Sequence, residues 1–378
     1  MNQQIIDKAK VVAAETLKRN AQTVDQNAQF PAESFRAFKA AGLLGLMFPR
    51  AYGGEEIDLL TFAEVMEIVG GACASSGMCF LMHNIACINI DKGSSPAQKE
   101  ELLKRFFADP VIATQAISEA GTGSHFYVPE LETKIDGDSV RLNGKKKFCT
   151  SGGHADWYVI YAKASANHQG ANFILLEKGT PGLAFDGQWR GMGLRGNSSI
   201  ALTFDNVRVP RSRLLGVEEG KAVDVLFGPN CATFILGQAA LNVGIAQHAL
   251  DAAVTHAKTR NHASAGPALS NHQAIRFYLA EMLAAVETAR LKVQDTARQV
   301  MDGHANATRS LFVTKFVASE ASRRVTDLAL QILGGRGYGG EGPVERLFRD
   351  ARAGALMGPT SELMMDWTGK LLTDMPLL

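Results

Sequence analysis

The most informative segment of this chain is Gln331–Glu362, QILGGRGYGGEGPVERLFRDARAGALMGPTSE. It follows a long run rich in alanine and leucine, and Gly334 and Gly335 let the backbone turn with positive φ and expose its amides. Such glycines most often have a purely structural role. The stretch therefore predicts the end of a long helix, then a charged segment, and then a loop at Gly358.

Along its whole length, the sequence divides into helical, strand and helical regions. The expected helices are Ile5–Lys18, Ala32–Ala41, Leu60–Val69, Pro96–Phe107, Gln238–Thr259, His272–Met301 and Ala307–Ile332. The expected strands are a hairpin over Leu131–Leu142 with an aspartate-glycine turn, then Trp157–Ala162, Asn172–Leu176 and Ile200–Phe204. The pattern predicts an α+β protein with an N-terminal helical domain (1–112), a small antiparallel β domain (113–222) and a C-terminal helical bundle (223–378).

Composition limits the possible partners and compartments. The chain has 378 residues, of which 46% are hydrophobic and 20% charged, with a formal net charge of +1. Its longest basic run is Lys145–Lys147, so we expect neither nucleic acid nor an anionic membrane surface as a partner. Five scattered cysteines without metal-ligand spacing indicate reduced thiols, a cytoplasmic protein and no metal site. We expect no signal peptide and no membrane span.

Ser118–Ser124, SEAGTGS, is the first segment with binding potential, because its glycines let backbone amides approach a ligand and its hydroxyls can bond it. On its own, such a loop is more often only a turn. It is not the G-x-G-x-x-G of a Rossmann site, and no P-loop pattern occurs. Neither a Rossmann dinucleotide site nor a P-loop phosphate site is therefore expected.

Taken together, the segments resemble the acyl-CoA dehydrogenase family. The opening stretch is similar to that family's Q-[IL]-x-G-G-x-G-[YF], P-V-E-[RK]-x-x-R-D-A-[KR] and E-G-T series, in the same order. SEAGTGSH (118–125) is similar to T-E-P-G-A-G-S-D, and KFCTSGG (147–153) to K-x-W-I-T-N-G-G. VGIAQHALD (243–251), HQAI (272–275) and the segment 30–54 also match in order. The resemblance implies a helical N-terminal domain, a middle β-barrel or sandwich and a C-terminal four-helix bundle.

The resemblance also implies bound FAD. Carried over position by position, Ser118 bonds the pyrimidine edge of the flavin, Phe148 lies against the isoalloxazine, and Thr150 lies near N5. Ser124 lies near substrate or phosphate, and Gly123 and Cys149 belong to the same two motifs. Family proline, aspartate and tryptophan are replaced here by Ala120, His125 and Phe148, and an apolar ring and a hydroxyl remain for the flavin.

Other matched residues imply an oligomer. Arg260 and Gln273 correspond to family residues that reach the flavin of a neighbouring subunit. The guanidinium of Arg260 could pair with the pyrophosphate of that cofactor, because its planar set of donors matches phosphate oxygens. Gln331, Gly334 and Gly335 correspond to residues at the adenosine end of a flavin bound across a subunit interface. Thr360 and Glu362 match loop positions that touch the cofactor. A homotetramer, built as a dimer of dimers, is the implied assembly.

The catalytic acid of the family is missing from its usual places. Gly358 stands where the family has the glutamate that removes the α-proton, so only a backbone N–H remains. Some members carry the acid on the first long helix of the bundle, at the position of Phe234. His125, after the flavin loop, and His83, in an apolar helix, are the remaining candidate bases, because neutral imidazole is a competent base near pH 7.

Three hypotheses follow for the activity. The first is α,β-dehydrogenation of an acyl-CoA or acyl-carrier thioester with an atypical base, with an electron-transfer partner. The second is a flavoenzyme of the same fold that needs no α-proton base, such as an acyl-CoA desulfinase or a flavin-dependent monooxygenase. The third is a flavin-binding protein without catalysis.

Overall fold

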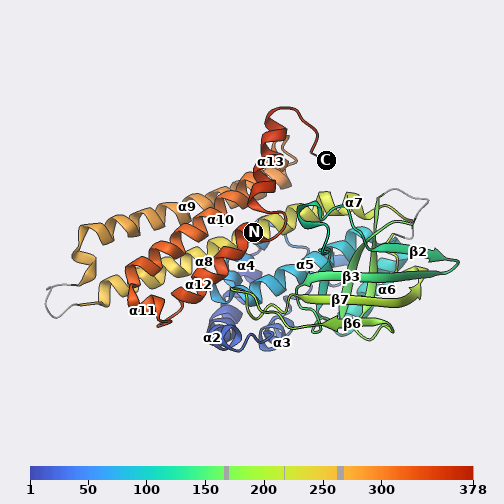
Figure 1. Ribbon diagram of the computed structural model, residues 1–378, viewed down its shortest axis with the longest axis horizontal. Coiled ribbons are helices and arrows are strands. Elements are labelled where there is room, and N and C mark those ends of the chain that lie inside the picture. The colour runs from blue at the N-terminus through green and yellow to red at the C-terminus, as the bar shows by residue number, and fades with distance from the viewer. Residues whose placement is uncertain (166–169, 217, 262–267, 378) are drawn as a thin grey trace.

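The computed structural model describes residues 1–165, 170–216, 218–261 and 268–377. Figure 1 shows an elongated molecule with a β-sheet at one end and long helices at the other. Helices from the N-terminal region lie between and below these two parts. The predicted order of helical, strand and helical regions is confirmed, and the predicted domain limits at residues 112 and 222 stay a prediction.

The N-terminal helices pack around a buried central helix, α5. Their bounds are α1 (Gln3–Val12), α2 (Lys18–Gln26), α3 (Ala32–Ala40), α4 (Leu59–Ala72), α5 (Ala74–Gly93) and α6 (Pro96–Ala108), with a π-helical segment at Ala13–Leu17. Helix α6 begins at a capping box, in which Ser95 and Gln98 satisfy each other's backbone amides. Helix α5 is buried over most of its length, because other elements cover it on every side.

The middle region forms one sheet in the strand order β1-β4-β2-β3-β7-β6, with β5 paired to β4. The strands are β1 (Ala113–Ala116), β2 (Glu132–Asp136), β3 (Ser139–Cys149), β4 (Trp157–Lys163), β5 (Ala171–Glu177), β6 (Leu183–Asp186) and β7 (Ile200–Pro210). The predicted hairpin is confirmed, with Asp136 opposite Ser139. The expectation of a purely antiparallel domain is wrong, since β1 runs parallel to β4 and β2 touches β4 in parallel.

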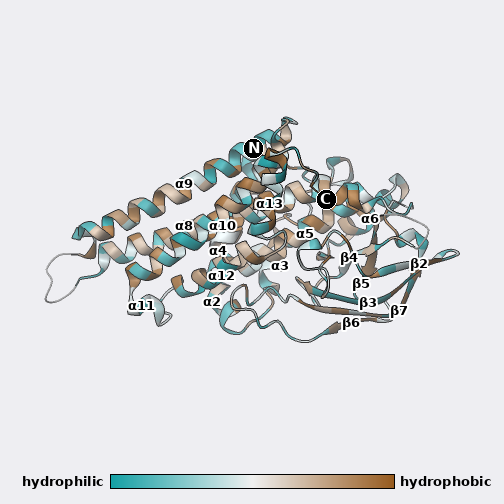
Figure 2. Cartoon of the chain, turned by 45° about the horizontal axis from the view of Figure 1, so that its top comes forward, coloured by the Kyte–Doolittle hydropathy of each residue, from teal (hydrophilic) through white to brown (hydrophobic). Residues whose placement is uncertain are grey.

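The C-terminal region is helical. Its elements are α7 (Ala222–Val225), α8 (Cys231–Thr259), α9 (Gln273–Met301), α10 (Ala307–Leu333), α11 (Gly335–Tyr338), α12 (Val344–Leu356) and α13 (Ser361–Leu372). Figure 2 shows hydrophilic and hydrophobic residues alternating along α9, as expected of a helix with one packed and one exposed face, whereas every residue of α8 from Ile235 to Ala246 is buried. Among the described helices, none has the length and apolar character needed to cross a membrane.

Helices α4 and α8 touch backbone to backbone, and this contact joins the N-terminal and C-terminal helices. A Cβ atom added at Gly244 would lie 2.1 Å from Glu67 O and 2.6 Å from Gly71 N. At Gly70 an added Cβ would lie 2.8 Å from Leu241 Cα. Only residues without a side chain permit this approach, so small residues determine how the two helices pack.

We expect Gly244→Ala to destabilise the protein by about 1–3 kcal/mol, because overpacking forces the backbones of α4 and α8 apart. Denaturant unfolding measures the change. Gly369→Ala on α13 is the matched control, since an added Cβ there meets nothing within 4 Å, and its stability should stay equal or rise. Equal stability of Gly244→Ala and wild type would show that the interface adapts without cost.

Candidate active site

A cavity of about 620 Å³ lies between the β-sheet, helices α5 and α8, and the segment that follows α12. Predicted site residues that line it are Ser118, Gly123, Ser124, Phe148, Thr150, Gly358 and Thr360. They come from three segments that are far apart in the sequence. The fold therefore brings the two flavin motifs and the loop without its acid to one place.

One wall of the cavity is aromatic and carries hydroxyl groups. The Phe148 side chain is 62% exposed, and its backbone has a φ of 55°. Its ring meets that of Trp189 edge-on, with centroids 6.4 Å apart. Thr150 Oγ1 lies 3.0 Å from Ser199 Oγ beside it. A flat ring system with a polar edge, such as isoalloxazine, fits a wall of this kind.

A buried ion pair supports the Ser118 loop beneath this wall. Lys146 is fully buried, and its Nζ donates to Ile117 O at 2.8 Å and to a carboxylate oxygen of Glu119. Glu119 also accepts from the backbone N–H of Leu131 at 3.0 Å and of Glu130 at 2.5 Å. Burial lowers the pKa of Lys146 to about 8, against the opposing effect of Glu119. Glu119 lines the cavity, yet its oxygens are committed to these partners.

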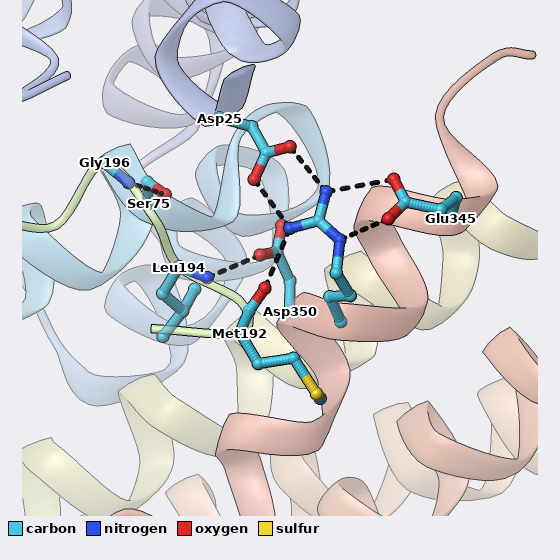
Figure 3. Close-up of polar contacts among 8 residues, drawn as sticks. Asp25, Ser75, Met192, Leu194, Gly196, Glu345 and Asp350 are labelled. Atoms are coloured by element: carbon cyan, nitrogen blue, oxygen red, sulfur yellow. Dashed lines mark hydrogen bonds and ion pairs between the residues drawn. The ribbon is translucent and has the colours of Figure 1, made fainter. Parts of the chain in front are cut away.

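Arg349 on α12 joins three segments around the second wall, and Figure 3 labels its partners Asp25, Met192 and Glu345. It donates to Asp25 on α2 at 2.9 and 2.5 Å, to Glu345 at 2.5 and 3.0 Å, and to Met192 O at 2.9 Å. Hydrogen bonds to Asp25, opposed by burial and helped by Glu345, raise the pKa of the guanidinium. This network fixes the loop containing Met192 and Leu194 against α12.

Asp350 completes the attachment of that loop. Its Oδ1 accepts from Leu194 N at 2.6 Å, and farther along the loop Gly196 N donates to Ser75 Oγ at 3.2 Å, as Figure 3 shows. Burial raises the pKa of Asp350 to about 6, against the Leu194 hydrogen bond and the charge of Arg346. A Cβ at Gly193 would lie 2.2 Å from Arg349 O, so glycine is needed for this close approach.

Lys315 on α10 holds the segment directly before Gly358, the position at which the acid is missing. Its side chain is fully buried, and Nζ donates to Gly354 O at 3.0 Å and Met357 O at 3.2 Å. A cation at the C-terminal end of α12 also complements the helix dipole. Burial lowers the pKa of Lys315 to about 7, against the opposing charge of Glu362. Lys315 thus fixes the backbone directly before Gly358.

The cavity has room for a carboxylate side chain at Gly358, but its described lining presents no unpaired carboxylate. A Cβ at Gly358 would meet only the Phe126 ring, at 3.9 Å. Phe234 lines the cavity at the alternative position, and Glu119 is the one carboxylate among the described lining residues. Because Glu119 is paired with Lys146, no unpaired carboxylate is presented to the cavity by the part of the chain that the structure describes.

His83 lies in the core and does not line the cavity. Its Nε2 lies 2.8 Å from Leu44 O, and its Nδ1 accepts from Ala113 N at 3.0 Å. Burial lowers the pKa of His83 to about 4. Both ring nitrogens have structural partners, so we do not carry His83 forward as a base.

His125 is exposed and does not itself line the cavity. It ends the 3-10 turn Gly123–His125, directly between the cavity-lining residues Ser124 and Phe126. Its ring contacts Tyr127 edge-on, with centroids 6.0 Å apart.

The remaining predicted cofactor residues lie outside the cavity of this single chain. Cys149 is buried behind Phe148, and Glu362 is exposed in the first turn of α13. Arg260, Gln273, Gln331, Gly334 and Gly335 lie at the ends of α8, α9 and α10, and all except the half-buried Arg260 are exposed. Figure 1 places α11, which follows Gly334, at the end of the molecule opposite the sheet.

Several lining residues were not predicted. They are Met82, Trp189, Gly191, Met192, Gly193, Leu194, Asn197, Ser199, Phe227, Asn230, Cys231, Arg349 and Arg352, among others. The run GQWRGMGLRGNSS at 187–199 carried a usable signal, because its closely spaced glycines permit backbone approach to a ligand. Asn230 and Cys231 carried none, since their role depends on where α8 begins.

Replacing Lys315 should change how stability depends on pH. The folded-state pKa of about 7 lies below the ordinary 10.5, so the unfolded chain binds more protons between these values, and stability rises with pH in that window. In Lys315→Met this contribution is absent, and in Lys315→Arg the side chain stays charged throughout. Denaturant unfolding from pH 7 to 10 should show wild type gaining stability relative to both variants; parallel curves would contradict this.

Comparison with known proteins agrees with the geometry. Three family profiles match in order: the acyl-CoA dehydrogenase N-terminal domain over residues 1–109, its middle domain over 114–207 and its C-terminal domain over 236–372. The chain is 33% identical to cyclohex-1-ene-1-carbonyl-CoA dehydrogenase of Geobacter metallireducens, covering 97% of this chain and 96% of that one. It is 34% identical to bovine (Bos taurus) mitochondrial short-chain specific acyl-CoA dehydrogenase, covering 91% and 83%.

Solved structures are similar over the same extent. Butyryl-CoA dehydrogenase from Megasphaera elsdenii superposes with a TM-score of 0.91 at 29% identity, covering 98% of this chain and 97% of that one. A chain from the structure of the electron transferring flavoprotein of Acidaminococcus fermentans gives 0.92 at 28%, covering 98% of both. The chain therefore belongs to the acyl-CoA dehydrogenase family, whose members are FAD-dependent oxidoreductases acting on the CH–CH group of acyl-CoA.

Proposed function

We propose that this protein oxidises the Cα–Cβ bond of an acyl thioester with FAD as its cofactor, and that no side-chain carboxylate takes the α-proton. The observation that carries the proposal is one cavity in which the wall at Phe148 and Thr150 meets the loop at Gly358. Its apolar lining, which includes Met82 and Phe227, suits an acyl chain. The names of the relatives favour a short or cyclic acyl group.

The roles of the site residues follow from their positions. Phe148 would lie against the isoalloxazine, Ser118 and Thr150 would hydrogen-bond its edge, and Thr360 would border it from the loop. Bound FAD would supply the acceptor for two electrons and the β-hydrogen. The backbone N–H of Gly358 would polarise the thioester carbonyl and so acidify the α-carbon.

The α-proton needs an acceptor other than Glu119, whose oxygens are occupied. We propose His125 for this role, because it lies between two cavity-lining residues and neutral imidazole accepts protons near pH 7. A base of this kind contributes roughly 10²–10⁴-fold to the rate. The proton would pass to an imidazole nitrogen and from there to solvent.

The same cavity also favours a second function. The lack of an unpaired carboxylate among the described lining residues also favours a flavoenzyme that needs no α-proton base. An acyl-CoA desulfinase and a flavin-dependent monooxygenase are the two candidates. A flavin-binding protein without catalysis would share the same feature.

Anaerobic mixing of the FAD-loaded protein with short acyl-CoAs separates these functions. Loss of flavin absorbance together with a 2-enoyl product, identified by mass, is the expected result. Product without flavin reduction, from a sulfinated acyl-CoA, would indicate desulfination. In a separate aerobic assay, oxygen uptake with externally reduced flavin would indicate a monooxygenase. Absence of every response would leave the non-catalytic interpretation.

Installing the family acid tests the role of Gly358 directly. We expect Gly358→Glu to raise the rate of flavin reduction by acyl-CoA roughly 10²-fold or more, because the cavity has room for the side chain and a positioned base accelerates proton transfer. Gly358→Gln is the matched control, with similar shape and no basic carboxylate. Equal rates in Gly358→Glu and wild type would show that the thioester binds with its α-carbon elsewhere.

We also propose a homotetramer that works with an electron-transfer flavoprotein in the cytoplasm. Gln331, Gly334 and Gly335 are exposed, and Tyr338 beside them is 80% exposed, as expected of residues that meet a neighbouring subunit. All five cysteines are free, which agrees with a reducing compartment.

A further inference from the structure

Three carboxamide side chains form a buried cluster at the cavity wall. Asn230, at the start of α8, donates from Nδ2 to Asn89 Oδ1 at 2.7 Å and to Gln115 Oε1 at 2.9 Å. Asn89 on α5 donates to the same Gln115 Oε1 at 3.0 Å. The exposed fractions are 0% for Asn89, 2% for Gln115 on β1 and 4% for Asn230. Gln115 and Asn230 line the cavity.

One hydrogen-bond donor of the cluster, Gln115 Nε2, has no acceptor among the described residues. Two N–H groups point at Gln115 Oε1, so its carboxamide orientation is fixed and Nε2 lies on the other side. Nε2 is buried and has no hydrogen-bond partner among the described residues. Asn230 stands at the N-cap of α8, yet its side chain makes no capping bond. A buried donor without an acceptor is costly, so a ligand that brings an acceptor oxygen to Nε2 would gain binding free energy.

The surroundings define the chemistry of that oxygen. None of the three amides is bonded to a charged side chain in the described structure, and Met82, Leu226 and Phe227 line the same cavity. A carboxylate would be buried here without a countercharge. A hydroxyl or a ketone oxygen needs none. The requirement is therefore a neutral oxygen within an otherwise apolar group.

We propose that Gln115 and Asn230 select acyl thioesters whose acyl group carries a neutral oxygen substituent, a hydroxyl or a ketone. This inference rests on the proposed function, because it assumes that an acyl thioester occupies the cavity. The oxygen accepts from Gln115 Nε2, and a hydroxyl also donates to the cluster. Plain alkyl groups leave the donor unpaired and bind less well.

The test compares hexanoyl-CoA with its 4-, 5- and 6-hydroxy derivatives and with 5-oxohexanoyl-CoA. Dissociation constants come from calorimetry with FAD-loaded wild type, and kcat/KM from flavin reduction. At least one oxygenated acyl-CoA should bind about 10-fold more tightly than hexanoyl-CoA, as expected for one hydrogen bond to a buried donor. Equal or tighter binding of hexanoyl-CoA would overturn the inference and leave the proposed function standing. If none of these thioesters binds, both fail.

Substitutions then assign the preference to the cluster. Gln115→Leu and Asn230→Leu should lose the roughly 10-fold preference for the oxygenated acyl-CoA over hexanoyl-CoA. Asn84→Leu is the matched control, because Asn84 is also a fully buried amide of α5 with an unpaired Oδ1, but it does not line the cavity. Equal losses for alkyl and oxygenated acyl-CoAs would overturn the inference in favour of a purely structural cluster. If the leucine variants fail to fold, the wild-type ratio still decides.

Discussion

The ion pair between Arg349 on helix α12 and Asp25 on α2 is the interaction on which the site depends. The two residues are far apart in the sequence, and their side chains are joined by two hydrogen bonds of 2.5 and 2.9 Å. The same guanidinium binds Met192 O, and the adjacent Asp350 binds Leu194 N. Replacing Arg349 is the costly change, because it leaves the buried Asp25 carboxylate without a countercharge, whereas Arg349 without Asp25 still pairs with Glu345.

At its other end, α12 is held by Lys315, which bonds the last carbonyls before Gly358. The loops of the cavity are therefore fixed by charged groups, and these groups are hydrogen-bonded to other protein atoms. Glu119 with Lys146 supports the Ser118 loop in the same way. The charged groups around the site therefore support the loops that form its walls. At Gly358, the position of the usual acid, only a backbone N–H remains.

The sequence predicted the fold well where local signals were strong. Helical periodicity indicated α8, α9 and α10, and the aspartate-glycine turn indicated the β2-β3 hairpin. Strands β1 and β6 were missed, because each has four residues and too little alternation to register. The parallel pairing of β1 with β4 depends on a distant segment and has no local signal.

For the site, motif positions identified Ser118, Phe148, Thr150 and Gly358, which the fold brings to one cavity. The partners of His83, Leu44 O and Ala113 N, are backbone atoms, so no side-chain pattern could reveal its structural role. The contact of Arg349 with Asp25 and the meeting of Asn230 with Gln115 arise only from tertiary packing. Sequence patterns thus located the cofactor wall but not the residues that support it.

The central claim is that this chain activates an acyl thioester without a carboxylate base. Its most direct test is deuterium exchange at the α-carbon of 3-thiahexanoyl-CoA bound to the FAD-loaded protein in D₂O, followed by mass spectrometry. We predict that exchange in wild type falls roughly 10²–10⁴-fold in His125→Gln, which removes the proposed base, and that Gly358→Glu exchanges faster than wild type. Wild-type exchange as fast as that of Gly358→Glu, and unchanged in His125→Gln, would contradict it.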